Sequence, residues 1–221
     1  MHEVSHNMGL MHSSKGTIEY GDESGVMGFT DDLEDDMKCF NAVKSWQLGW
    51  YADGHETINP LEAPFQGKIV GVANYDTRGN LPVIIKIIGH NDGNDYYVSF
   101  NRAAGINSGS TTGRNKVHIF SQNSTKIDDF SYVKATLLQE ESFEIENFAD
   151  SSFTLQISVD KISLKKGSTG FAKISISLQE IDNDKKKGNK KNKQNKKNKG
   201  KNRNKNKTRG KNKKTKRKML R

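Results

Sequence analysis

Three histidines and one glutamate at the start of the chain have the types and spacing of a zinc site. The residues after Met1 read HEVSHNMGLMH, which places His2 and His6 four residues apart, with Glu3 beside the first of them. On an α-helix this separation puts both imidazoles on one face, where their nitrogens can reach the same metal ion. We therefore expect His2 and His6 to bind one zinc ion.

The third histidine, His12, reaches that ion only if the helix ends before it. Continued winding would carry His12 about a turn and a half farther along the axis. Gly9 offers an exit, because glycine accepts a positive φ angle without a Cβ clash and lets the chain double back. Three nitrogen ligands leave the fourth tetrahedral position for water, as in a catalytic zinc site. The alternative is an amphipathic helix start with incidental histidines.

Such a site predicts the hydrolysis of peptide bonds. A zinc ion lowers the pKa of its bound water towards neutrality and polarises the scissile carbonyl. Glu3 is the expected general base, which takes the proton of that water and later passes it to the leaving amine. The expected substrate is a protein or glycoprotein.

Met27 extends this motif. It follows His12 by fifteen residues, in a loop rich in glycine and acidic residues. On its own, Met27 would be interpreted as an ordinary buried methionine. Zinc sites of the HExxHxxGxxH type, however, are followed by a tight turn whose methionine packs beneath the metal. At this distance from the motif, Met27 is expected to be that Met-turn residue.

Taken together, these stretches resemble a known family, the gametolysin-type metallopeptidases of the metzincin clan. The similarity is dense over residues 2–51 and weaker beyond them. The stretches that carry it are His2 to Ser13, Glu19-Tyr20-Gly21-Asp22, Met27-Gly28, Cys39 to Ala42, Lys44 to Tyr51, Tyr97 to Arg102 and Gly105 to Asn107.

The resemblance implies a zinc metalloendopeptidase with Glu3 as base and Met27 in the Met-turn; its ligands would be His2, His6 and His12. The family's members act on extracellular-matrix and cell-wall proteins, so a secreted protein is expected. Because the chain opens one residue before its zinc motif, we expect an N-terminally truncated form whose secretion signal lies upstream. The alternative function is a catalytically inactive fragment that binds a matrix or polyanion.

The remaining histidines and the single cysteine give no second site. His55, His90 and His118 have no metal-like spacing and are interpreted as ordinary histidines. Cys39 has no partner for an intrachain disulfide. As a fourth zinc ligand it would close the site, and the alternative is a disulfide with a cysteine upstream of Met1 in a longer protein.

The predicted fold class is α+β, in three parts. Residues 1–56 are expected to form the C-terminal part of a metzincin catalytic domain, with an active-site helix, the Met-turn and a C-terminal helix over residues 31–51. That last helix is predicted from an apolar stripe at spacings of three and four, made of Leu33, Met37, Phe40, Val43 and Trp46. Residues 57–181 alternate in polarity and are rich in β-branched residues, which predicts an antiparallel β-sandwich.

Residues 182–221 are expected to be a disordered tail. The chain has a formal net charge of +10, but this segment alone carries +19 and residues 1–181 carry −9. The tail repeats Lys and Asn without aromatic residues, so it cannot bury enough surface to offset the entropy of ordering. Its charge predicts binding to anionic polymers, the alternative being a solvated tail without a partner. No apolar run in the chain is long enough to span a bilayer.

Overall fold

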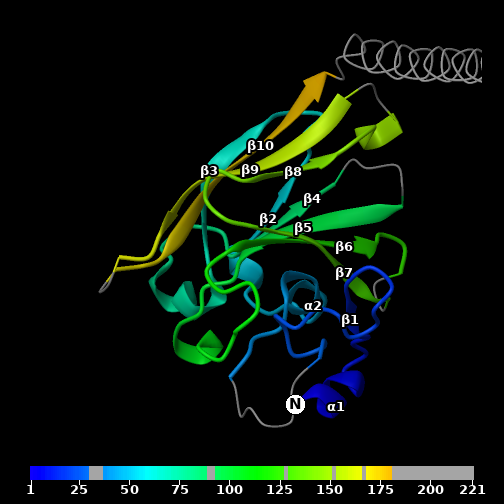
Figure 1. Ribbon diagram of the computed structural model, residues 1–221, viewed down its shortest axis with the longest axis vertical. Helices are drawn as coiled ribbons and strands as arrows, with labels where there is room; N and C mark the ends of the chain where they lie inside the picture. The colour runs from blue at the N-terminus through cyan, green and yellow to red at the C-terminus, as the bar shows by residue number, and fades with distance from the viewer. Residues whose placement is uncertain (30–36, 89–92, 127–128, 151–152, 166–167, 181–221) are drawn as a thin grey trace, which may run out of the picture. The chain divides into compact units, whose positions relative to one another are not determined.

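Two β-sheets form most of the structure between Met1 and Glu180, which is one compact unit (Figure 1). The computed structural model describes residues 1–29, 37–88, 93–126, 129–150, 153–165 and 168–180. The predicted tail, residues 182–221, lies outside the described residues, and so does His90. None of the helices in the described part of the chain is long and apolar enough to cross a membrane.

The larger sheet has six strands in the order β1-β7-β6-β5-β4-β2. The strands are β1 (Ser13–Ser14), β2 (His55–Ile58), β4 (Ile84–Ile87), β5 (Asn94–Phe100), β6 (Val117–Asn123) and β7 (Ser131–Leu137). The four central strands pair antiparallel, whereas the edge strands β1 and β2 run parallel to their neighbours β7 and β4. The sheet therefore joins the N-terminal segment to the rest of the chain.

The smaller sheet is antiparallel and has the order β3-β10-β9-β8. Its strands are β3 (Phe65–Val70), β8 (Ser142–Ile145), β9 (Phe153–Ser163) and β10 (Phe171–Glu180). Every second residue in the middle of β9 and near the start of β10 is buried, as in Leu155-x-Ile157-x-Val159, because successive side chains of a strand point to opposite faces. The buried face packs against the larger sheet, and both sheets contribute to one apolar core.

The other face of the larger sheet is covered by α2 (Ala42–Gln47). The alternation along β5 and β6 separates two cores: Val98 and Ile119 face the smaller sheet, whereas Tyr97 and Phe120 pack with Val43 of α2. The first helix, α1 (His2–His6), lies at the end of the molecule that holds the N-terminus (Figure 1). Short 3-10 helices lie in the connections: η1 (Ala52–Gly54), η2 (Val72–Thr77), η3 (Gly105–Asn107) and η4 (Phe148–Asp150).

The predicted fold class is wrong. The N-terminal segment is not a helical part joined to a separate sandwich, since β1 is an edge strand of the larger sheet and α2 packs on that sheet. Of the helix expected over residues 31–51, the described part from residue 37 onward contains only the six residues of α2, whose start Asn41 caps by accepting a hydrogen bond from the Lys44 amide. Met37, at the start of the expected stripe, is 58% exposed, and residues 30–36 lie outside the described part.

Candidate metal centre

The first two predicted ligands are placed by α1. The helix is five residues long, and its only buried residue is Ser5, whose hydroxyl donates to the Met1 carbonyl at 2.8 Å. His2 and His6 lie on the same side, with ring centroids 5.0 Å apart. Gly9 then adopts the positive φ angle that the sequence predicts, 81°, and ends the turn after the helix.

The reversal at Gly9 brings His12 back to the other two histidines. The ring centroid of His12 lies 4.8 Å from that of His6 and 5.4 Å from that of His2. One ring nitrogen from each histidine belongs to a group whose members all lie within 4.8 Å of one another. In tetrahedral zinc sites with histidine ligands the nitrogens lie about 3.3 Å apart, so small side-chain adjustments suffice to hold a zinc ion.

Hydrogen bonds at the outer nitrogens fix which atom of each ring faces inward. The Nδ1 atom of His2 donates to the Val26 carbonyl at 2.8 Å, and Nδ1 of His6 donates to the Leu10 carbonyl at 2.8 Å. Nδ1 of His12 donates to the Glu19 carboxylate at 2.7 Å. These acceptors carry no proton, so in each neutral ring Nδ1 holds the hydrogen and Nε2 holds the lone pair. In all three residues Nε2 is therefore the nitrogen that could bind a metal ion, in a ring oriented by the hydrogen bond at Nδ1.

The loop that contains Met27 is hydrogen-bonded to the segment that carries the three histidines. Met27 is 1% exposed and packs in a small apolar cluster with Leu10 and Phe40. Its carbonyl accepts from the Ser13 amide at 2.8 Å, directly after His12, and the preceding Val26 carbonyl holds His2. The loop thus contacts the backbone next to one ligand and the side chain of another. The Met-turn role itself stays a prediction.

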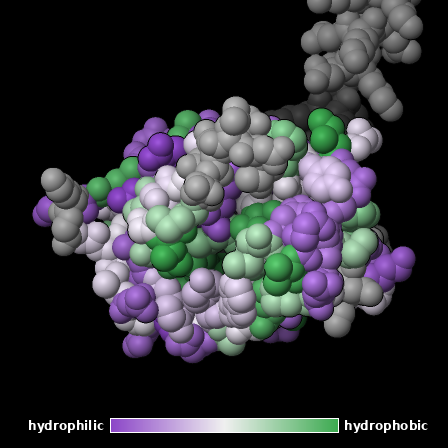
Figure 2. Space-filling model, turned by 90° about the horizontal axis from the view of Figure 1, so that it is seen from below, coloured by the Kyte–Doolittle hydropathy of each residue, from purple (hydrophilic) through white to green (hydrophobic). Residues whose placement is uncertain are grey.

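Glu3, the predicted base, is exposed on α1 and follows His2 directly. The surface around α1 is rich in apolar side chains. Figure 2 views this end of the molecule and shows apolar surface interspersed with polar groups. The exposed apolar residues of the first 29 positions are Met1, Val4, Met8, Met11, Ile18, Tyr20 and Phe29.

A buried polar network behind the histidines was not predicted. The carboxylate of Asp22, only 2% exposed, accepts hydrogen bonds from the hydroxyls of Ser13 and Ser24 and from the side-chain amide of Asn41. The Asn41 amide also donates to the Ser131 hydroxyl on β7 at 3.1 Å. The network therefore ties the segment after His12 to the Met27 loop, to the start of α2 and to the larger sheet. The only signal in the sequence was that Asp22 and Asn41 fall in the stretches that resemble the family.

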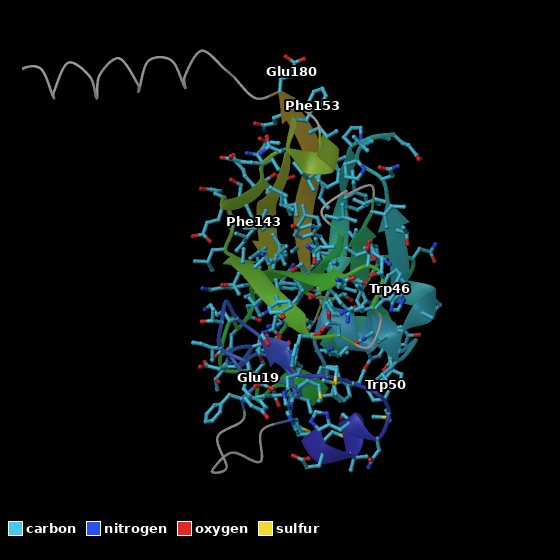
Figure 3. All side chains as sticks on the ribbon, turned by 90° about the vertical axis from the view of Figure 1, so that its right-hand side faces the viewer. Glu19, Trp46, Trp50, Phe143, Phe153 and Glu180 are labelled. Atoms are coloured by element: carbon cyan, nitrogen blue, oxygen red, sulfur yellow. The ribbon has the colours of Figure 1, made fainter. Side chains whose placement is uncertain are left out.

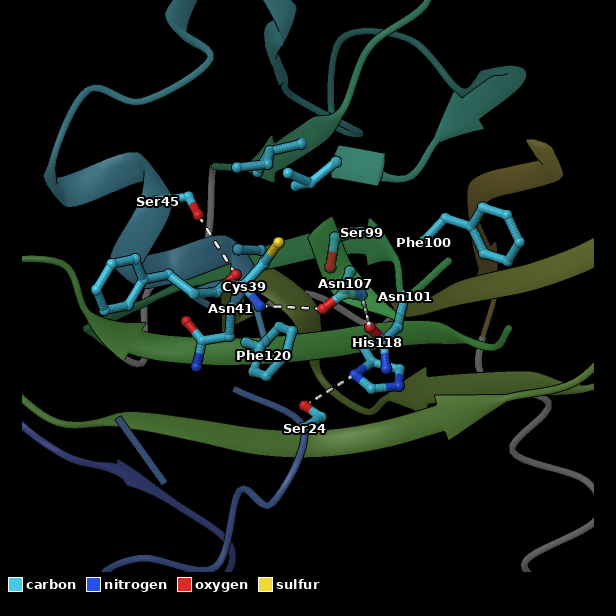
Figure 4. A pocket seen from close by; sticks show the side chains of 14 residues that line it. Ser24, Cys39, Asn41, Ser45, Ser99, Phe100, Asn101, Asn107, His118 and Phe120 are labelled. Atoms are coloured by element: carbon cyan, nitrogen blue, oxygen red, sulfur yellow. Dashed lines mark hydrogen bonds between the residues drawn. The ribbon is translucent and has the colours of Figure 1, made fainter. Parts of the chain in front are cut away.

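His118 extends this network, although its spacing gave no reason to single it out. Its Nε2 atom donates to the Gly113 carbonyl at 2.9 Å, and its Nδ1 atom lies 3.3 Å from the Ser24 hydroxyl (Figure 4). Burial lowers the pKa of His118, which favours the neutral form of the ring at physiological pH.

Cys39 and His118 both line a small pocket, which Figure 4 shows. Its backbone amide donates to the Asn107 side chain at 3.0 Å, and burial raises the pKa of its thiol to about 11. Only the thiolate is a good metal ligand. Within the described residues, Cys39 does not belong to the group that could hold a metal ion, which consists of His2, His6 and His12. The candidate site therefore consists of the three histidines.

Comparisons with known proteins identify the family of the chain. Residues 1–157 match the model of a protein family described as gametolysin peptidase M11. The chain is also similar to an autolysin of Chlamydomonas reinhardtii, with 42% identity over 66 residues, which cover 30% of this chain and 10% of that protein. No solved structure matches the chain. Because the family match extends over more than half of the 221 residues and includes the three histidines, the chain belongs to the gametolysin peptidase M11 family.

Proposed function

We propose that this protein is a zinc-dependent metalloendopeptidase that hydrolyses peptide bonds in cell-wall or extracellular-matrix proteins. The observation that carries the proposal is the convergence of ring nitrogens from His2, His6 and His12 within 4.8 Å. Membership of a peptidase family supports the reaction class. The substrate class is supported by the similarity to an autolysin, of which this chain matches about a tenth.

The three histidines would hold the metal through their Nε2 atoms. When bound, zinc supplies Lewis acidity, which lowers the pKa of water and polarises a carbonyl group. The protein itself contributes orientation, because each ring is fixed through its Nδ1 atom. A site of this kind is more effective when its ligands are held in place before the metal and the substrate bind.

Glu3 would act as the general base. Its place on α1, beside His2, puts its carboxylate at the same exposed end of the molecule as the metal ligands. There it would take a proton from the attacking water and deliver it to the departing amine, the amide nitrogen of the cleaved bond. The apolar side chains exposed around α1 would contact an extended segment of the substrate.

The test is to separate metal binding from proton transfer. In the full chain, Glu3→Gln should retain zinc, measured by elemental analysis, but lose at least about a hundredfold in protein cleavage, the typical contribution of a general base. His6→Ala should lose both zinc and cleavage. The matched control is Glu146→Gln, which changes an exposed glutamate after β8 and should leave both unchanged. Cleavage by Glu3→Gln at the parent rate, or cleavage that survives a zinc chelator, would contradict the proposal.

The charge of residues 182–221 favours a second role, which is binding to a polyanion. This segment has a net charge of +19 and no aromatic residue. Lysine-rich chains bind anionic polymers by releasing counterions, without preference for a base or sugar sequence. Such binding would hold the peptidase near an anionic matrix, or would be the whole function if the chain does not cleave protein.

A further inference from the structure

We propose that Glu19 is a positioning residue for the metal centre, acting through His12. Its carboxylate would select the tautomer of His12, orient the ring and raise the affinity for the metal ion. The inference rests on the proposed zinc site and adds a residue to it that no pattern in the sequence assigned to metal binding.

The support of the three histidines is asymmetric. His2 and His6 donate to the backbone carbonyls of Val26 and Leu10. A backbone carbonyl is present whatever side chain stands at those positions. His12 instead donates to the carboxylate of Glu19, at 2.7 Å. A carboxylate behind a ligating imidazole makes the ring a stronger electron donor than a carbonyl does, and it lowers the net charge of the loaded site. His12 is thus the ligand whose strength depends on one replaceable side chain.

The backbone holds Glu19 in place for this contact. Residues 15–21 form a tight hairpin, in which Lys15 and Ile18 exchange both backbone hydrogen bonds at 3.0 and 3.1 Å. The hydroxyl of Ser14, in the buried strand β1, donates to the Glu19 carbonyl at 2.7 Å. Figure 3 shows Glu19 toward the end of the molecule where α1 lies. The backbone of Glu19 is therefore held by the strand that follows His12, which keeps its carboxylate within reach of the ring.

The next residue of the hairpin restrains the face of the same ring. The ring centroid of Tyr20 lies 4.1 Å from that of His12, with the two planes 42° apart. Glu19 therefore contacts the edge of the His12 imidazole, while the Tyr20 ring lies against its face. The two adjacent residues leave the Nε2 side of His12, which faces His6 at 3.1 Å, as the side that is available to a metal ion.

The competing explanation is an ordinary ion pair at the surface. The Glu19 side chain is 55% exposed and that of His12 is 14% exposed. An exposed pair of this kind contributes little to folding stability. A carboxylate that supports a metal ligand has a different signature, since its removal typically weakens metal binding 10- to 100-fold while the fold is retained. Metal affinity and the stability of the metal-free protein therefore distinguish the two.

The experiment compares Glu19→Ala and Glu19→Gln with the parent, each as the full chain. Zinc dissociation constants are measured by competition with a chromophoric chelator, and melting temperatures are measured without metal. We expect Glu19→Ala to bind zinc about 10- to 100-fold more weakly. Glu19→Gln should lose less, because its amide oxygen still accepts from His12. The matched control is Glu23→Gln, whose exposed carboxylate accepts from Thr112 and contacts none of the three histidines.

Each outcome has a distinct meaning. Parent-like zinc affinity in Glu19→Ala, with zinc bound tightly by both proteins, would overturn the role of Glu19 and leave the zinc site intact. If Glu19→Ala lowers the melting temperature of the metal-free protein but leaves the zinc affinity unchanged, the contact is a structural ion pair instead. A parent chain that takes up no zinc would overturn the metal centre itself, and this inference with it.

Discussion

The Nε2 atoms of His6 and His12 lie 3.1 Å apart, although both rings already donate from Nδ1 to fixed acceptors. In the neutral state each of these Nε2 atoms holds a lone pair, so two partial negative charges face each other and repel. The contact becomes favourable when a proton or a metal ion lies between them. The protein thus holds two nitrogen lone pairs in an arrangement that a cation would stabilise.

We therefore predict that zinc stabilises the folded protein. A ligand that binds the folded state alone adds about 4 kcal/mol to the free energy of unfolding at a thousand times its dissociation constant. Thermal unfolding with zinc, and after dialysis against a chelator, measures the difference. His6→Ala should abolish the zinc-dependent shift, whereas His55→Ala, outside the candidate site, should preserve it. An equal shift in His6→Ala would show that the ion binds elsewhere.

Asp22 should be essential for stability behind the site. Its carboxylate is buried and accepts from Ser13, Ser24 and Asn41. Asp22→Ala would remove the buried acceptor that these three donors share, which we expect to cost about 2–4 kcal/mol in the free energy of unfolding. Urea unfolding measures this, with the exposed Asp76→Asn as the control. A loss below about 0.5 kcal/mol would contradict the importance of the network.

Lys44 should give stability a distinct pH dependence. Its side chain is fully buried on α2, and its ammonium group donates to the Asp129 carbonyl at 2.9 Å. Burial lowers the pKa of Lys44 to about 8, against about 10.5 for an exposed lysine. Below pH 8 both the folded and the unfolded chain are protonated, and the folded state bears the full penalty of a buried charge. Between pH 8 and about 10.5 the unfolded chain holds more protons, so the contribution of Lys44 to stability improves as the pH rises.

Lys44→Met should therefore stabilise the protein at pH 7, by roughly 1–3 kcal/mol, and the gain should shrink as the pH approaches 10. The Asp129 carbonyl keeps a donor, since the Gln122 side chain also reaches it at 3.0 Å. The measurement is urea unfolding at several pH values, with the exposed Lys134→Met as the control. A gain that is constant from pH 7 to 10 would show that the effect comes from packing and not from the charge.

Deleting residues 182–221 should weaken binding to anionic polymers. The deletion removes a net charge of +19 and leaves a chain with a net charge of −9. The shortened protein should elute from a heparin column at a lower salt concentration than the full chain, and its binding should depend less steeply on salt. Cleavage of a small uncharged substrate should be unaffected. Unchanged retention would exclude this segment from matrix binding.

Several local features were predictable because they depend on neighbouring residues. The spacing of His2 and His6 placed both rings on one side of α1, and Gly9 adopts the left-handed conformation that glycine allows. The alternating polarity of residues 57–181 predicts strands, and β6, β8 and β9 are among those found there, because alternation reports which face of a strand is buried. The roles of the histidines, Glu3 and Met27 in catalysis stay predictions.

The sequence by itself thus determined the residue types of the candidate metal site, their spacing, the family and the strand-rich character of residues 57–181, all of which are properties of short segments. Only the tertiary structure decided that Ser13 pairs with Ser131, 118 residues away, and that the carboxylate of Asp22 is buried against Ser13. It also decided that Glu19 supports His12. A periodic pattern shows which side of a segment is buried, but the partner that buries it is chosen by packing of the whole chain, which explains why the predicted division into a helical part and a sandwich failed.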